Sequence, residues 1–439
     1  MSFAEEGLYG KACKVLCSKG IAPNNIETFT ILANKHPVKN SPNIPRISES
    51  DSVKLLGNFD VKDCIRSFPT GTACGPSGLR IEHLLNACEA PLSVNIIGTI
   101  KKFLNVLLSR KAPVEAAPYF AGASLTALIK SDVGSQLDIR PIAVGEVLRR
   151  LAGKCICKQL VEKAHGILTP HQFGVACPGG VEQVIHHMRA TVEESWPLES
   201  DFVILKVDMS NAFNTVSRQA VLDECASHIP EILPWVSWCY GSHPFLWHPL
   251  GRFESATGVQ QGDPIGPFLF SLALNRLILS LQDVPGLSQN IWYLDDGLLC
   301  GTRSAIAESL RLIKMAQSWS GLQLNMAKCE LFSKSDLSDF PTEMRKSNLP
   351  NFEVLGAPIG DDAFCESYIK RKRSAVEALL RGISNLCDPQ VSVALLRTCG
   401  GFCKLSHLAR CCPPQQVQQS LAHFDRAVMH CLGIQQQLN

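Results

Sequence analysis

The sequence lacks the features of a secreted or membrane-spanning chain. The first residues, Met1 to Lys19, show no basic stretch followed by an apolar one, which is the pattern of a secretory signal. The longest apolar run, Phe268 to Leu281, is interrupted by Asn275 and Arg276 and is too short to cross a bilayer. We therefore expect a soluble, intracellular protein with no membrane partner.

Other absences narrow the chemistry. There is no internal repeat, no long low-complexity tract and no Gly-rich segment that matches a phosphate-binding P-loop. The formal net charge is only +2, while hydrophobic residues make up 46% of the chain, enough for a substantial core. Without a secretory signal, we interpret the 19 cysteines as mostly reduced, small core residues rather than a disulfide framework.

Positive charge is nevertheless concentrated in two blocks. Residues 140–163 have a local net charge of +4, and residues 366–410 have one of +5. Two basic blocks on either side of a more neutral middle could line a groove for a phosphate backbone. Two solvated helix faces are the alternative interpretation. The second block includes four consecutive basic residues, Lys370, Arg371, Lys372 and Arg373.

The middle of the chain alternates between strand and helix patterns. The expected strands lie within residues 124–129, 139–144, 201–208, 291–299, 321–332 and 352–359. The expected helices cover 146–165, 217–228, 264–281, 303–320 and much of 368–432, with Gly321 ending the fourth. Residues 51–110 also look helical, with a break at 70–78 after which Ser77 could cap the next helix. This order favours an α+β fold, a small antiparallel sheet with helices on one face.

Acidic residues lie where two of these strands end. Asp295 and Asp296 belong to an Asp-Asp-Gly segment that is typical of a tight turn, and Asp208 ends an apolar strand 87 residues earlier. If the strands are neighbours, three carboxylates converge, a costly arrangement that divalent cations would neutralise. Two Mg²⁺ ions about 3.5–4 Å apart would then form a clamp for in-line phosphoryl transfer. An exposed turn and a solvated strand end are the alternatives.

Three segments together resemble motifs A, B and C of reverse transcriptases. A Tyr-x-Asp-Asp sequence alone would occur by chance in roughly a few per cent of chains this long, whereas three motifs in the family's order are highly specific. The resemblance is to the non-LTR retrotransposon branch and covers roughly residues 70 to 410. The segments are Asp208-Met209-Ser210-Asn211-Ala212-Phe213, Gly258-Val259-Gln260-Gln261-Gly262-Asp263-Pro264 and Tyr293-Leu294-Asp295-Asp296.

The resemblance implies a right-hand polymerase fold. Residues 1–50 would be an N-terminal extension and linker, and 51–200 the fingers with an N-terminal helical region. Residues 201–360 would form a palm with an antiparallel, ferredoxin-like sheet, and 361–439 a helical, thumb-like region, with the reverse transcriptase domain spanning about 113–360. The implied partners are an RNA template, a DNA primer and dNTPs, and the implied cofactor is a pair of Mg²⁺ ions. The family also allows a nuclear location.

The resemblance assigns roles to single residues at the reacting centre. Asp208, Asp295 and Asp296 would be the catalytic and metal-binding carboxylates. Lys130 and Arg140, in segments similar to the family's fingers, would meet the triphosphate, and Arg140 could do so bidentately. Exposed basic residues without a ligand are the alternative for either cation.

Further roles follow around that centre. Phe213 would lie beneath the sugar and exclude a 2′-hydroxyl, which disfavours an RNA-dependent RNA polymerase. Gln261 would pack near the base and sugar, and Lys328 would act as general acid to pyrophosphate. Gly356 belongs to a turn that resembles the one that grips the primer end, and the four basic residues from Lys370 to Arg373 would contact duplex phosphates.

Some features lie outside these assignments. Residues 171–174, His-Gln-Phe-Gly, resemble the family's stretch before motif A, whereas Gln260 and Asp263 stand where many relatives have Pro and Ser. Cys399, Cys403, His407 and Cys411 recur every four residues, which on one helix favours a packing face over a tetrahedral zinc site.

The extent of the chain leaves its origin open. About 60 residues precede the resemblance, too few for an endonuclease, and no acidic cluster suggests a ribonuclease H. We therefore expect a module of a longer element, a truncated copy or a stand-alone gene. A catalytically decayed or domesticated copy that binds RNA–DNA duplexes without synthesis is the alternative function.

Overall fold

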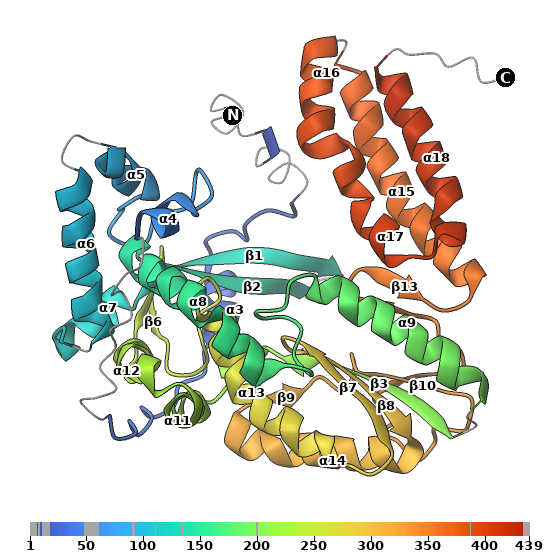
Figure 1. Ribbon diagram of the computed structural model, residues 1–439, viewed down its shortest axis with the longest axis horizontal. Coiled ribbons are helices and arrows are strands. Elements are labelled where there is room, and N and C mark those ends of the chain that lie inside the picture. Colours follow the sequence, from blue (N-terminus) through green and yellow to red (C-terminus); the bar gives the residue numbers. More distant parts are fainter. Residues whose placement is uncertain are drawn as a thin grey trace.

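Two β-sheets occupy the middle of the molecule, and helices surround them (Figure 1). The computed structural model describes residues 7, 9–10, 18–47, 61–89, 93–109, 111–133, 136–198, 201–386 and 388–432. None of the helices in these ranges has the length and apolar character needed to span a membrane. The cysteines in the described ranges are free thiols, and most of them are buried.

The first sheet has the strand order β2-β1-β5-β6. β1 (Ala123–Val133) and β2 (Gln136–Gly145) form a long antiparallel hairpin where the sequence predicted two strands. β5 (Phe245–His248) pairs in parallel with β1, and β6 (Gly251–Glu254) forms the outer edge. α3 (Ile26–Asn34) packs its apolar side against one face of this sheet. Part of the predicted N-terminal extension therefore belongs to the packed fold.

The second sheet carries the acidic residues and has the order β11-β10-β3-β8-β7. Its neighbouring strands are antiparallel, except that β10 and β11 run in parallel. In the central strand every residue but Lys206 is buried, as expected for a continuous apolar run. The strands are β3 (Phe202–Val207), β7 (Leu287–Tyr293), β8 (Asp296–Thr302), β10 (Glu330–Ser333) and β11 (Arg345–Ser347).

Helices cover both faces of the second sheet. α13 (Gly266–Gln282) and α14 (Arg303–Ser320) pack on the face that includes Val203. α9 (Gly180–Leu198) packs on the opposite face, which includes Phe202 (Figure 1). The expectation of helices on one face is therefore wrong, because both faces of the central strand are apolar and both need cover.

α8 (Val147–Leu168) and several shorter helices share one apolar core with α13 and α14. α8, α11, α13 and α14 confirm predicted helices, and Gly321 ends α14 with a φ of +71°. The shorter helices are α4 (Val61–Arg66), α5 (Ile81–Glu89), α6 (Ser93–Leu108), α7 (Ala117–Phe120), α10 (Ala212–Thr215), α11 (Arg218–His228) and α12 (Leu233–Tyr240).

The C-terminal helices have a core of their own, and α15 and α18 lie side by side (Figure 1). The hairpin of β12 (Phe352–Val354) and β13 (Ala357–Ile359), which the sequence predicted, leads into them. These helices are α15 (Asp362–Ser384), α16 (Pro389–Leu395), α17 (Ser406–Cys411) and α18 (Pro414–Cys431).

Three local expectations differ from the structure. Ser77 caps no helix, because its hydroxyl donates to the Glu146 carboxylate and α5 begins only at Ile81. The strand expected over 321–332 is divided, and its first part, β9 (Gln323–Leu324), pairs with the short β4 (Met209–Ser210). The Cys/His repeat from 399 to 411 lies on a π-helical turn, a 3-10 turn and α17 rather than on one helix.

Candidate active site

The second sheet brings the three acids to one end. Val207 pairs with Gly297 across β3 and β8, so Asp208 follows Val207 to the position beside Asp296. Cβ atoms of directly opposed residues in such a pair are about 4.5–5.5 Å apart. β7 and β8 pair as far as Tyr293 and Asp296, which leaves Asp295 in the hairpin turn. The two strands are thus neighbours, as the sequence argument required.

The turn itself differs from the expected Asp-Asp-Gly. Leu294 and Asp295 are the two turn residues, and Asp296 already begins β8. Leu294 has a φ of +55°, a left-handed conformation at the first central position, where type II′ turns usually have glycine. The sequence gives no sign of this, because leucine is disfavoured there.

Burial and mutual repulsion raise the pKa values of the paired acids. Burial, followed by the charges of Asp295 and Asp208, raises the pKa of Asp296 to about 6, although its side chain still reaches solvent. Burial first, and then Asp208, also raises the pKa of Asp295. The three carboxylates therefore form a centre of mutually repelling negative charge that favours a bound cation.

Two predicted cations act on this centre. The positive charges of Lys130 and Arg140 lower the pKa of Asp295 against the larger effect of burial. Arg140 pairs with Leu128 in the β1–β2 hairpin, and a bulge between Ile129 and Ser131 leaves Lys130 out of the ladder. Lys130 and Arg140 are exposed, so both could reach a phosphate in front of the acids.

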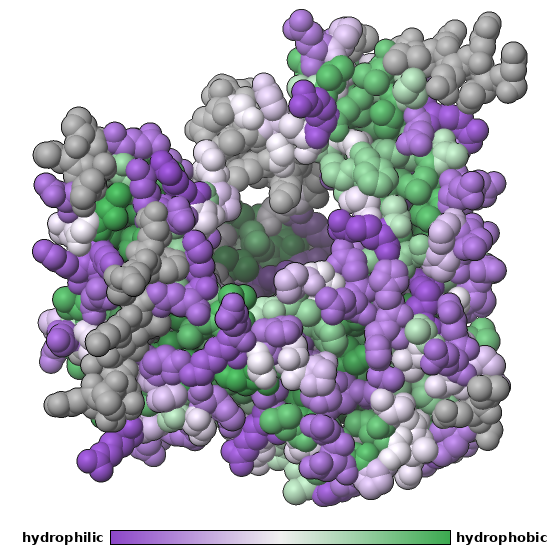
Figure 2. Space-filling model, in the orientation of Figure 1, coloured by the Kyte–Doolittle hydropathy of each residue, from purple (hydrophilic) through white to green (hydrophobic). Residues whose placement is uncertain are grey.

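A pocket of about 680 Å³ opens beside Asp208 and Asp296. Two residues to which the sequence assigned roles, Lys328 and Gly356, also line it. Asp295, Lys130, Arg140, Phe213 and Gln261 do not line it. Figure 2 shows the molecule hollowed between the side that carries α4–α6 and the C-terminal helices. The residues that line the pocket include Lys206, Asp208, Asp296, Lys328, Arg345 and Gly356.

The loop of residues 258–264, here called the 258–264 loop, forms backbone hydrogen bonds to both α10 and β2. The N–H of Val259 donates to the carbonyl of Phe213 at 2.7 Å, and the carbonyl of Gln261 accepts from the N–H of Ala143 at 2.7 Å. A Cβ at Gly258 would lie 2.3 Å from the Phe213 carbonyl oxygen, so only glycine permits this approach. Phe213 is half-buried and stacks on Phe270, with ring centroids 4.6 Å apart.

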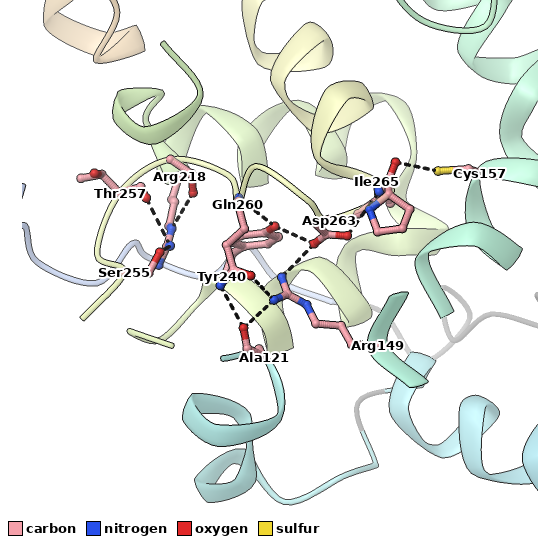
Figure 3. A network of polar contacts seen from close by, with 12 residues as sticks. Ala121, Arg149, Cys157, Arg218, Tyr240, Ser255, Thr257, Gln260, Asp263 and Ile265 are labelled. Carbon is pink, nitrogen blue, oxygen red and sulfur yellow. Dashed lines mark hydrogen bonds and ion pairs between the residues drawn. The ribbon is translucent and has the colours of Figure 1, made fainter. Parts of the chain in front are cut away.

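The two unusual residues of this loop are held by a buried network that the sequence did not reveal (Figure 3). Nη2 of Arg149 donates to Oδ2 of Asp263 at 2.8 Å, and the Tyr240 hydroxyl donates to the same oxygen at 2.7 Å. Gln260 accepts from Arg149 and donates through Nε2 to the Ala121 carbonyl at 2.9 Å. Burial, the largest single effect, works against the charge of Arg149, but Asp263 together with Tyr240 and Cys239 outweighs it, and the pKa of Arg149 is raised. A charged residue in a buried loop requires such a partner.

A second buried arginine supports the start of the same loop. Arg218 donates to the carbonyl of Gly258 at 3.0 Å and to the hydroxyl of Ser255 at 2.7 Å (Figure 3). The guanidinium carbons of Arg218 and Arg149 lie 5.2 Å and 5.4 Å from the ring centroid of Tyr240. The loop is therefore braced from two helices, α8 and α11.

Most charges of the first basic block are buried or paired, whereas its first member, Arg140, is exposed. Arg149 and Arg150 are buried, which removes two of its charges from the surface. Lys158 and Lys163 form ion pairs with Asp63 and Glu231. The second block is more open: Lys370, Arg371 and Lys372 are exposed, whereas Arg373 is half-buried and pairs with Glu377 at 2.9 Å.

The predicted primer turn contacts the C-terminal helices. Leu355 and Gly356 both have positive φ values, +46° and +85°. His407 in α17 lies 3.0 Å through Nε2 from the carbonyl oxygen of Leu355, and its Nδ1 lies 3.5 Å from Sγ of Cys411. A nitrogen that faces a carbonyl must carry the proton, so Nε2 donates and Nδ1 accepts from the thiol. His407 thus has a structural partner at this turn.

The donor set at the acidic centre fits Mg²⁺ better than a transition metal, because all three side chains offer hard oxygen atoms. Within the described ranges, no three His, Cys, Asp or Glu side chains form a ready-made metal cage. Mg²⁺ usually takes one or two carboxylates together with substrate phosphates, so a complete protein cage is not required. Asp208, Asp295 and Asp296 are the residues that could hold such ions.

This geometry fits an α+β polymerase fold, in which acids at one end of a largely antiparallel sheet face basic residues of a neighbouring hairpin. The chain belongs to the reverse transcriptase (RNA-dependent DNA polymerase) family, whose model matches residues 130–359, just over half of its length. Together with the relatives described next, this confirms the resemblance to non-LTR retrotransposon reverse transcriptases.

Curated relatives are similar to this chain at low identity. A retrovirus-related Pol polyprotein from the type-1 retrotransposable element R2 of Nasonia vitripennis is 25% identical over 47% of this chain and 21% of its own length. The retrotransposable element SLACS 132 kDa protein of Trypanosoma brucei gambiense is 25% identical over 69% of this chain and 25% of its own. The Pol polyprotein of the type-2 element R2DM of Drosophila melanogaster is 26% identical over 44% and 19%. The matches span a quarter or less of these relatives.

Proposed function

We propose that this chain is an RNA-directed DNA polymerase that extends a primer 3′-hydroxyl along an RNA template by two-metal phosphoryl transfer with dNTPs. The convergence of Asp208, Asp295 and Asp296 beneath the charges of Lys130 and Arg140 carries the proposal. Membership of the reverse transcriptase family supports the type of reaction. Because the matches span only a fraction of each relative, the proposal concerns the polymerisation step alone.

In this proposal the regions of the right-hand fold have different roles. We assign residues 51–200 to the fingers and an N-terminal helical region, 201–360 to the palm and 361–439 to a helical, thumb-like region. Asp208, Asp295 and Asp296 hold two Mg²⁺ ions, which when bound would neutralise charge and lower the pKa of the attacking hydroxyl. The chain's own side chains bind, orient and select the substrates.

The side chains around the acids have separate tasks. Lys130 and Arg140 bind the triphosphate, and their charges offset the charge that develops on the transferred phosphoryl group. The ring of Phe213 takes the space that a 2′-hydroxyl would need. Gln261 supports the nucleotide from the braced loop, and Lys328, which lines the same pocket as Asp208, gives a proton to pyrophosphate.

Two further elements hold the nucleic acid. The Leu355–Gly356 turn, which lines the pocket beside Asp208, holds the primer end. The exposed cations Lys370, Arg371 and Lys372 contact duplex phosphates together with Arg373, which follows them in α15.

Primer extension by the purified chain tests the proposal. We expect Mg²⁺-dependent incorporation of dNTPs on an RNA template and its loss with EDTA. Asp295→Asn should reduce extension by about a thousandfold, because several kcal/mol of charge stabilisation is lost, while duplex binding measured by fluorescence anisotropy stays unchanged. The matched control is Asp283→Asn, which alters an exposed carboxylate at the end of α13.

The outcomes separate the alternatives. Full extension by Asp295→Asn would remove the two-metal assignment. Duplex binding without any extension by the unaltered chain would instead identify a catalytically decayed reverse transcriptase. Preference for rNTPs over dNTPs would indicate RNA synthesis.

A further inference from the structure

The segment before the first acid, His171 to Gly174, lies against the hairpin that carries Asp295 and Asp296. Gln172 forms a parallel bridge with Trp292 of β7. The N–H of Trp292 donates to the carbonyl of His171 at 2.7 Å, and the N–H of Phe173 donates to the carbonyl of Trp292 at 2.8 Å. These residues therefore extend the edge of the second sheet, although more than 100 residues separate them from it in the chain.

The Gln172 side chain reaches past this bridge to the turn. Its Oε1 accepts from the N–H of Leu294 at 2.7 Å and from the N–H of Gly174 at 3.0 Å. Its Nε2 donates to the carbonyl of Leu294 at 3.1 Å. One side-chain amide thus satisfies both backbone groups of Leu294. Gln172 has no exposed surface, so water does not compete for these bonds.

Leu294 is the residue that needs such support. Its φ of +55° is disfavoured for a residue with a side chain, and it immediately precedes the two acids. The neighbouring acids raise the free-energy cost of this turn, because Asp208, Asp295 and Asp296 repel one another in the absence of a cation. A turn of this kind persists only where its surroundings determine it.

Gly174 makes the contact sterically feasible. A Cβ at this position would lie 2.8 Å from both the backbone nitrogen and Cγ of Leu294. Real Cβ atoms do not approach so closely, so any other residue would push the two segments apart. The pair of Gln172 and Gly174 therefore fits the turn as a unit, the amide providing the bonds and the glycine the space.

We propose that Gln172 is a positioning residue, which holds Leu294 in its left-handed conformation and thereby fixes where Asp295 and Asp296 present their carboxylates. The expected effect of Gln172 on catalysis rests on the proposed function. Its expected effect on the conformation of the turn is independent of that function and can be measured whether or not the chain makes DNA.

Hydrogen exchange followed by mass spectrometry tests the structural content. Gln172→Leu keeps the approximate volume of the side chain but removes all three hydrogen bonds. We expect amide exchange of the peptide spanning 293–297 to quicken by roughly fivefold to tenfold, because the Leu294 N–H loses its hydrogen bond to Gln172. Exchange of a peptide within 202–207 should be unchanged. Gly174→Ala should quicken the same peptide by displacement.

Steady-state extension tests the catalytic consequence. In Gln172→Leu, kcat should fall by about 100-fold, as expected for a misplaced reacting group, with little change in KM for dNTP. Adding Leu294→Gly should restore part of the lost kcat, since glycine adopts a positive φ without support. A merely structural role for Gln172 would not be rescued in this way.

The control is Asn275→Leu, which removes a buried amide in α13 that donates to the carbonyl of Ile167 at 3.4 Å and forms no hydrogen bond to the described residues 293–297. This variant should leave exchange at 293–297 and kcat unchanged. Unaltered exchange at 293–297 in Gln172→Leu, or equal losses in Gln172→Leu and Asn275→Leu without rescue, would overturn the inference. An inactive unaltered chain would instead count against the proposed function, and exchange would still decide the role of Gln172.

Discussion

Arg149 and Asp263 form an ion pair in which both side chains are buried, with 1% and 3% of their surface exposed. The pair joins α8 to the 258–264 loop, 114 residues further along the chain. Its partners Tyr240 and Gln260 complete the hydrogen bonds that a buried charge requires. This explains how the loop keeps its place although it carries a buried aspartate and a buried glutamine.

Breaking this pair should destabilise the protein strongly. Arg149→Met and Asp263→Leu should each cost about 3–5 kcal/mol, because each leaves the other charge buried without its partner. The double variant should cost clearly less than the sum of the two. Urea unfolding of the four proteins measures the coupling. Additive losses would show that the two charges do not depend on each other.

The raised pKa of Asp296 makes stability depend on pH in a defined direction. Its folded value of about 6 lies above the ordinary value of 3.8, so between these values the folded state holds a proton that the unfolded chain has lost. Without metal, this group should therefore make the protein less stable as pH rises from about 4 to about 6. Melting temperatures over this range should decline less in Asp296→Asn.

Mg²⁺ should reverse this effect, because it binds the ionised carboxylate. We expect the ion to raise the melting temperature at pH 7 more than at pH 5. Lys206, whose charge lowers the pKa of Asp296, provides a second check. Lys206→Met should move the pH-dependent region upwards, and a profile unchanged by both substitutions would assign the titration to another group.

Phe213 should set the choice of sugar. Phe213→Val opens the space beneath the ribose and should raise rNTP incorporation relative to dNTP by roughly 10–200-fold in kcat/KM. Phe270→Leu is the matched control, since it removes the ring stacked on Phe213 but leaves Phe213 itself. Equal selectivity in Phe213→Val and the unaltered chain would make the ring a packing residue only.

The basic residues of α15 should differ in their contact with nucleic acid. Lys370→Gln and Lys372→Gln should each lower the slope of log affinity against log salt by about 0.7–0.9, the effect of one lost phosphate contact. Arg373→Gln should change it less, because Arg373 is half-buried and paired with Glu377. Binding titrations at several salt concentrations measure the slopes, and the same slope in all three variants would mean that exposure does not decide the contact.

Local patterns predicted the elements of the central part of the chain well. The apolar run before Asp208 and the period of the helices α11, α13 and α14 are properties of adjacent residues, so the chain reveals them directly. The same patterns predicted the end of α14 at Gly321 but misjudged the covered faces of the sheet and the role of Ser77. Ser77 binds Glu146 instead of capping a helix, because a partner 69 residues away competes for its hydroxyl.

The candidate site divides in the same way. The order and chemistry of Asp208, Asp295 and Asp296 were legible in the chain, as were Lys130 and Arg140, because each lies in a recognisable local segment. The residues that hold these side chains in place could not be predicted from the sequence. Gln172 and Leu294 are 122 residues apart, and an ordinary glutamine gives no local sign of the turn that it will hold.

Residue types at short spacings were enough to predict the α+β class, the acidic segment around Asp295 and the family. The register that sets Asp208 beside Asp296, the left-handed conformation of Leu294 and the burial of Arg149 with Asp263 became visible only in the folded chain. Those features arise where distant segments meet, and the free energy of such a contact depends on the surroundings that folding creates, not on the neighbours along the chain.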